Sequence, residues 1–160
     1  MTWFFPTFTN LNAHIALSRC TRWSVVSVAD GDTITVLTAE KKQHKIRLLG
    51  IDAPEKAQAF GQRSKQSLSD LVYKKQVTIE YKEQDRYKRY LGKVLVDGKD
   101  ANLMQIKTGM AWWYRQYKRS QTPEDQKAYA DAEAVARGSK VGLWADKEPV
   151  APWEFMRQKN

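Results

Sequence analysis

Residues 23–37 read Trp-Ser-Val-Val-Ser-Val-Ala-Asp-Gly-Asp-Thr-Ile-Thr-Val-Leu, and this stretch decides the fold class. Valine, isoleucine and threonine fill its two halves, and Asp30-Gly31 separates them. An Asp-Gly between two β-prone runs is a strong hairpin signal, because these residues accept the positive φ angles of a tight turn. We therefore expect two antiparallel strands, over residues 23–29 and 33–37.

The rest of the chain supplies more strands and a few helices. Further β-prone runs predict strands over 43–50, 76–81 and 91–96. Helical spacing and capping residues predict helices over 60–74, 101–107 and 122–137. Five short strands with helices inserted among them predict an α+β protein, mainly β, built on a five-stranded barrel of the oligonucleotide-binding (OB) type with three helices. Leu143 and Trp144 are expected to close one end of the barrel.

A chain of 160 residues fits one domain with a segment at each end. Residues 1–20 start apolar but lack the basic beginning of a secretory signal, and we expect an N-terminal arm or a degenerate targeting segment there. The domain is expected over 21–145, followed by a Pro-containing C-terminal tail over 146–160. No run of residues has the length and apolar character needed to cross a membrane, so we expect no membrane association.

The composition restricts the chemistry. The 27 Lys and Arg residues exceed the 18 Asp and Glu residues, giving a net charge of +9. This excess suits a polyanionic partner such as nucleic acid, although a merely soluble basic protein would show it equally well. The single Cys20 excludes an intramolecular disulfide and a Cys-rich zinc site. Only His14 and His44 are available for histidine-centred catalysis, and His44, flanked by lysines, is expected on a solvated strand face.

Three stretches far apart in the sequence carry reactive side chains, namely residues 30–33, 47–55 and 85–92. Each has an ordinary explanation by itself. An Asp-Gly is common in hairpin turns, Arg47 fits an outward-facing strand position, and residues 85–89 fit a charged loop. None of the three stretches alone predicts an enzyme.

Together they supply what phosphodiester hydrolysis needs. Asp32 and Asp52 are hard oxygen ligands of the kind that Ca²⁺ accepts. Glu55 lies three residues after Asp52 and can orient or deprotonate a water molecule. Arg47 and Arg89 can bind phosphate oxygens with a planar fork of donors, which lysine cannot do. The combination predicts a cation site, a base and two phosphate-binding groups.

The order Asp-Gly-Asp-Thr, Arg-Leu-Leu-Gly-Ile-Asp-x-Pro-Glu and Asp-Arg-Tyr-x-Arg-x-Leu-Gly resembles the staphylococcal (micrococcal) nuclease-like family, from about Trp23 to Trp144. The resemblance implies a five-stranded OB barrel with three helices and a monomeric Ca²⁺-dependent nuclease. Such an enzyme cuts DNA and RNA, prefers single strands and leaves 3′-phosphate ends. The implied roles are metal binding for Asp32, Asp52 and the carbonyl of Ala53, catalysis for Arg47, Glu55 and Arg89, and substrate binding for Arg86, Tyr87 and Tyr117.

Two positions depart from the family pattern. The family more often has threonine where Ala53 stands, so a hydroxyl contact is lost while the carbonyl remains. It usually has glycine where this chain has Lys88, which places another positive charge near the substrate.

Residues 111–119 interleave aromatic and basic side chains, a mixture that suits base stacking beside phosphate contacts. The alternative is that Trp112 or Trp113 fills the core. Two other functions stay open at this point. A non-catalytic OB-fold domain could bind nucleic acid without cutting it, and a protein-interaction module could use the aromatic stretch as its surface.

Overall fold

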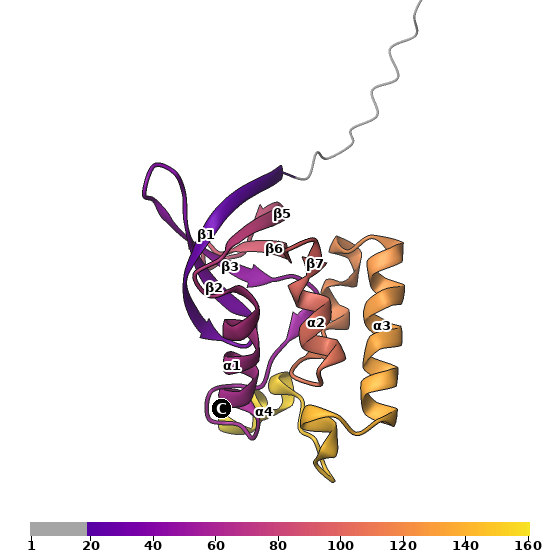
Figure 1. Cartoon of the computed structure of the whole chain (residues 1–160). Coiled ribbons are helices and arrows are strands. Elements are labelled where there is room, and N and C mark those ends of the chain that lie inside the picture. Colours follow the sequence, from indigo (N-terminus) through magenta and orange to yellow (C-terminus); the bar gives the residue numbers. More distant parts are fainter. Residues whose placement is uncertain (1–18) are drawn as a thin grey trace, which may run out of the picture.

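The computed structural model describes residues 19–160, and within them five strands close into a barrel (Figure 1). Neighbouring strands are antiparallel in the order β3-β2-β1-β5-β6, and β3 then pairs in parallel with β6 through Ile46 and Tyr90. This last pairing leaves no open edge between the first and last strands of the barrel. The predicted five-stranded OB barrel is confirmed. Its strands are β1 (Arg19–Asp30), β2 (Thr33–Leu37), β3 (Gln43–Leu48), β5 (Gln76–Gln84) and β6 (Tyr90–Val96).

The predicted hairpin forms, and its first strand is longer than expected. β1 pairs with β2 on one side, for example Ser24 with Leu37, and with β5 on the other, from Arg19 to Ser24. A register shift between Val25 and Ser27 accompanies this change of partner, as bulges in bent barrel strands do. The strand begins at Arg19, so the last two residues of the expected N-terminal arm join the barrel. The rest of that arm, with His14, lies outside the described residues.

The barrel interior is filled by alternate side chains of the strands. Ile46 and Leu48 of β3, for example, are 0% and 1% exposed, while Lys45 before them is exposed and Arg47 between them is half-buried. Burying a side chain of this size contributes about 1.5–3 kcal/mol of hydrophobic free energy. The same alternation corrects one prediction. His44 lies on the inward face with Ile46, and its ring stacks 5.3 Å from Trp23 at the barrel mouth.

The described residues form four α-helices where three were predicted: α1 (Gly61–Val72), α2 (Ala101–Lys107), α3 (Pro123–Gly138) and α4 (Pro152–Lys159). Of these, α1 and α2 pack on the barrel strands and α3 packs on α2. Thr122 caps α3 as expected, because its hydroxyl accepts a hydrogen bond from the Asp125 N–H at 3.1 Å. The additional helix, α4, lies in the segment that was expected to be a tail. No helix within residues 19–160 combines the length and the hydropathy needed to span a membrane.

The short elements link the barrel to a second hydrophobic cluster. They are the strands β4 (Ile51–Asp52), β7 (Lys99–Asp100) and β8 (Trp112–Trp113) and the 3₁₀ helices η1 (Arg115–Ser120) and η2 (Gly142–Ala145). Leu143 and Trp144 do not close the barrel, contrary to expectation. They pack instead with Trp112, Ala136 and Ala151 outside it, because η2 leads the chain away from the barrel after α3. Trp112 is thus the tryptophan that fills a core, while Trp113 is only half-buried.

Candidate active site

Arg47 joins two of the sequence-predicted carboxylates. Its guanidinium lies 3.1 Å from the Asp32 carboxylate and donates to Asp52 at 2.8 Å. It also donates to the carbonyl of Ile51 at 2.9 Å. Arg47 pairs across the sheet with Thr33, which places it beside the hairpin turn that carries Asp32. β3, the hairpin turn and β4 thereby meet at one point on the barrel surface.

Asp32 is 5% exposed and is held on both oxygens. Oδ1 accepts from the Thr33 hydroxyl at 3.0 Å, and Oδ2 accepts from the Ala53 N–H at 2.7 Å. Burial raises the pKa of the Asp32 carboxyl above its usual range, although the Arg47 charge opposes this. Burial likewise raises the pKa of Asp52, again against Arg47 and with the charge of Glu55 adding to the rise.

This donor set suits a hard divalent cation. Two desolvated carboxylates share a single guanidinium, so the trio carries a net negative charge when both are ionised. Ca²⁺ takes six to eight oxygen ligands. Residues 19–160 contain no group of three or more His, Cys, Asp or Glu side chains placed to hold a metal. Asp32 and Asp52 would therefore contribute a minority of the oxygens, and backbone carbonyls, water and substrate would contribute the others.

Glu55 lies in the loop between β4 and α1, close enough to Asp52 for its charge to raise the Asp52 pKa. Its backbone N–H donates to Oε1 of Gln58 at 2.8 Å. Its half-buried carboxylate makes no hydrogen bond or ion pair with any described residue. Glu55 is thus a carboxylate beside the proposed cation site whose oxygens remain available to accept a proton.

Arg89 lies one residue before β6, the strand that pairs in parallel with the strand of Arg47. Arg47 pairs with Leu91 in the parallel β3–β6 contact, and Arg89 precedes Leu91 by two residues, which is one side-chain repeat along a strand. The structure does not bring Arg89 to Asp32 or Asp52. Its Nε donates to Asp85 at 2.8 Å, and its backbone N–H donates to the other oxygen of that carboxylate at 3.0 Å.

Lys88 adopts a left-handed φ of 60° in the turn from Asp85 to Arg89. This conformation costs a residue with a side chain about 1 kcal/mol and costs glycine little. The turn thus explains why glycine suits this position in the family that the sequence resembles. Here the turn keeps that shape with a lysine, helped by the Asp85 carboxylate, which also accepts from the Tyr87 N–H at 2.9 Å.

The three sequence-predicted substrate contacts come from two loops. Tyr87 is 63% exposed, and the guanidinium groups of Arg86 and Arg89 lie 4.8 and 5.3 Å from its ring centre. Tyr117, in η1, contacts the ring of Tyr114 at 5.1 Å. Tyr117 also lies near Arg47, so the two residues are on the same side of the site.

Tyr114 is a residue near the site that the sequence did not single out. Burial raises its pKa, and the nearby charge of Asp52 raises it further. Its backbone N–H donates to the Gly50 carbonyl at 2.8 Å, next to the β4–β8 pairing of Asp52 with Trp112. Tyr114 is brought to the site by the pairing of Asp52 with Trp112, which lie 60 positions apart in the sequence. No local sequence pattern reveals such a pairing.

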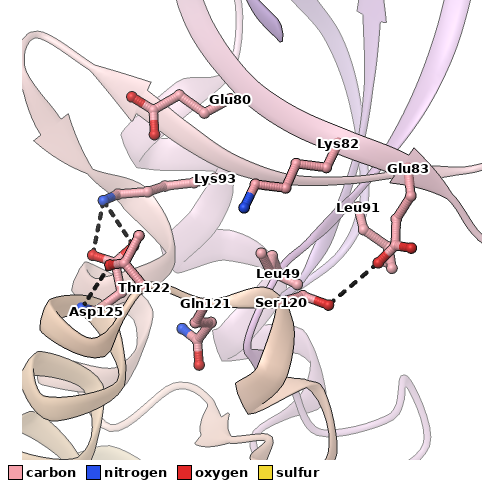
Figure 2. Close-up of a pocket in the computed structure, with 10 residues that line it drawn as sticks. All are labelled: Leu49, Glu80, Lys82, Glu83, Leu91, Lys93, Ser120, Gln121, Thr122 and Asp125. Carbon is pink, nitrogen blue, oxygen red and sulfur yellow. Dashed lines mark hydrogen bonds and ion pairs between the residues drawn. The ribbon is translucent and has the colours of Figure 1, made fainter. Parts of the chain in front are cut away.

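A pocket of about 120 Å³ lies between β5–β6 and η1–α3 (Figure 2). Leu91, which pairs with Arg47, and Leu49 line it. Lys93 is held by Asp125 at 2.9 Å, while the Lys82 ammonium points into the pocket and has no ion-pair partner among the described residues. This pocket was not foreseen in the sequence.

Comparisons with known proteins agree with the geometry. A family model described as staphylococcal nuclease homologue matches residues 45–146. The chain is 46% identical over 148 residues to an uncharacterized endonuclease of Haemophilus influenzae, covering 90% of this chain and 80% of that protein. It is 41% identical to protein ParB of Escherichia coli (87% and 81% covered) and 39% identical to a micrococcal nuclease of Shigella flexneri (85% and 80% covered). The barrel, these identities and the matched stretch show that the chain belongs to the staphylococcal nuclease homologue family.

Proposed function

We propose that this nuclease is Ca²⁺-dependent and hydrolyses the phosphodiester bonds of both DNA and RNA, with single strands preferred and 3′-phosphate ends as products. The observation that carries the proposal is the cluster of Asp32, Arg47 and Asp52 with the unpaired carboxylate of Glu55 beside it. Nucleic-acid hydrolysis as such follows from the family and from relatives named as endonucleases and micrococcal nuclease. The metal, the range of substrates and the roles of individual residues are the proposed part.

The donor set favours Asp32, Asp52 and the Ala53 carbonyl as the groups that would hold Ca²⁺. When bound there, the ion would supply positive charge that polarises the scissile phosphate. Glu55 accepts a proton from the attacking water as the oxygen of that water bonds to phosphorus. Arg47 and Arg89 donate hydrogen bonds to the phosphate oxygens as their negative charge increases. The bond from phosphorus to the 5′ oxygen breaks, so that phosphate stays on the 3′ side, and the leaving oxygen takes a proton from solvent to become a 5′ hydroxyl.

The test incubates the protein with labelled single-stranded DNA or RNA, with Ca²⁺, with Mg²⁺ or with a chelator. We expect both substrates to be cut with Ca²⁺, the cutting to stop with chelator, and the fragments to end in 3′-phosphate. Cleavage that persists in chelator would overturn the metal assignment. Fragments with 5′-phosphate would overturn the direction of bond breaking.

A non-catalytic nucleic-acid-binding domain is the alternative for this barrel. A domain that had lost catalysis would be expected to lack at least one reactive group, whereas all five are present: Asp32, Arg47, Asp52, Glu55 and Arg89. Binding of the labelled strand in Ca²⁺ without cleavage would nevertheless favour it.

A further inference from the structure

Residues 147–160 lie beyond the stretch that the family model matches, yet they contact the loop that carries Glu55. We propose that this segment, the C-terminal brace, holds the Glu55 loop (residues 54–60) in its working position, and that Gln58 is the positioning residue through which it acts. The inference rests on the proposed role of Glu55 as the base.

The side chain of Gln58 joins the two segments. Its Oε1 accepts from the Glu55 N–H at 2.8 Å, and its Nε2 donates to the Val150 carbonyl at 3.0 Å. The backbone N–H of Gln58 also donates to the Glu55 carbonyl at 2.8 Å. A carboxamide bonded at both ends cannot rotate without losing one of these bonds. The backbone of Glu55 is thus connected to a residue 92 positions after Gln58.

The other end of the loop leaves Glu55 little freedom. A Cβ at Gly61, the first residue of α1, would lie 2.2 Å from the Glu55 carbonyl oxygen, so the helix starts directly against the loop. Phe60 has a left-handed φ of 67°, a conformation that an aromatic residue keeps only when its surroundings fix it. Glu55 is therefore held between the start of α1 and the brace.

The brace is itself anchored next to the site, and α4 lies near the start of α1 in Figure 1. The ring of Trp153 lies 5.6 Å from that of Trp112 and 5.4 Å from that of Tyr114. Trp112 pairs with Asp52 across β4 and β8. The brace thus contacts neighbours of both the proposed base and a proposed metal ligand. Residues of both segments line a pocket of about 200 Å³, and the bond from Gln58 to Val150 is the hydrogen bond that joins them among the described residues.

A loosened brace should affect the chemical step more than substrate binding. Proton transfer needs the base within hydrogen-bonding reach of the water, and displacement of a catalytic group by about 1 Å can lower the rate about 100-fold. The groups that are proposed to bind phosphate, Arg47 and Arg89, lie on the barrel and do not contact the brace through any hydrogen bond in residues 19–160. We therefore expect kcat to fall while KM stays nearly constant.

The decisive comparison is Gln58→Met against Gln62→Met in the full chain. Methionine keeps the size of glutamine but can form neither bond of Gln58. Gln62 is exposed on α1 and has no hydrogen bond from its side chain to a described residue, so it controls for the substitution itself. We expect Gln58→Met to lower kcat at least tenfold with KM within twofold, and Gln62→Met to match the wild type. A kcat for Gln58→Met within twofold of the wild type would overturn the proposal, as would an equal loss in both variants.

A second comparison tests whether Gln58 acts through the brace. Trp153→Ala removes the ring that anchors the brace, and Met156→Ala changes an exposed residue of the same helix. If Gln58 and Trp153 belong to one unit, the double variant Gln58→Met/Trp153→Ala should lose little more kcat than Gln58→Met alone. Losses that multiply would show that Gln58 acts within its loop only, and the brace would be rejected. If Trp153→Ala does not fold, Gln58→Glu takes its place, because its carboxylate can still accept from the Glu55 N–H but cannot donate to the Val150 carbonyl, and a kcat equal to that of the wild type would reject the brace.

Amide hydrogen exchange separates this inference from the proposed function. The Glu55 N–H should exchange faster in Trp153→Ala than in Met156→Ala, whether or not the protein cuts nucleic acid, because a released brace no longer fixes the Val150 carbonyl to which Gln58 donates. If the wild type is inactive but this difference is seen, the role of Glu55 is refuted and the brace is retained. If the wild type is active and the Glu55 amide exchanges at the same rate in both variants, the brace alone is refuted.

Discussion

Arg47 bridges Asp32 and Asp52, at 3.1 and 2.8 Å, so that a single guanidinium is the counter-charge of both carboxylates that are proposed to bind metal. The same guanidinium is proposed to bind the scissile phosphate. A cation at the two carboxylates would take over the electrostatic role of Arg47 there and would free its donors for phosphate oxygens. Binding of metal and binding of substrate would in this way support each other.

The first prediction follows from this bridge. Arg47→Ala leaves two buried carboxylates without their counter-charge, which costs about 3–5 kcal/mol when a buried pair is broken. We expect a lower melting temperature without metal and a larger rise on adding Ca²⁺ than in the wild type, measured by thermal unfolding. Lys127→Ala, which removes an exposed i,i+4 ion pair with Asp131, is the control and should change stability little. If Ca²⁺ does not change the melting temperature of Arg47→Ala, cation binding at these carboxylates is contradicted.

The second prediction concerns the proposed base. Glu55→Gln keeps the shape of the side chain but cannot accept the proton, and general bases contribute about 100- to 10,000-fold to rates. We expect kcat to fall within that range while the affinity for single-stranded DNA in Ca²⁺ changes little, measured by single-turnover cleavage and by fluorescence anisotropy. Near-normal turnover would refute the assigned role.

The third prediction uses the left-handed turn at Lys88. Lys88→Gly should raise the free energy of unfolding by up to about 1 kcal/mol, because glycine adopts a φ of 60° without strain. Lys88→Ala removes the same charge but keeps the strain, so it should not stabilise. Denaturant unfolding of the two variants separates the effect of backbone conformation on stability from the effect of the lost charge. Equal free energies of unfolding for Lys88→Gly and Lys88→Ala would contradict the explanation.

The fourth prediction is a pH dependence at Asp85. Burial tends to raise the pKa of this carboxyl, but hydrogen bonds from the backbone and guanidinium of Arg89 and from the Tyr87 N–H outweigh it, so the pKa is lowered. A lowered folded-state pKa stabilises the protein above the ordinary carboxyl pKa of about 3.9, and this stabilisation is lost as the pH falls through the folded-state value. We expect the wild type to lose stability below about pH 4 more steeply than Asp85→Asn. Parallel curves of unfolding free energy against pH for the two proteins would exclude this contribution.

Several parts of the fold and the site could be predicted because their signals are local. Alternating side chains and the Asp30-Gly31 pair indicate the hairpin, although the turn residues are Gly31 and Asp32 and neither has a positive φ. Thr122 caps α3 as its position predicts. His44 shows where such reasoning fails. Its lysine neighbours suggested that its side chain faces solvent, but the register of its strand turns the ring toward Trp23. Register depends on the partner strands and not on sequence neighbours.

The sequence by itself determined the barrel class, because strand periodicity and turn chemistry act over a few residues, and it supplied the side chains from Arg47 to Glu55 that are proposed to be reactive. Only the tertiary structure decided that Arg47 bridges two carboxylates, that Tyr114 lies near Asp52, and that Val150 accepts a hydrogen bond from Gln58. These contacts join segments from different elements of the fold. They depend on how whole elements pack, since no local preference specifies which distant residue a strand or a side chain will meet.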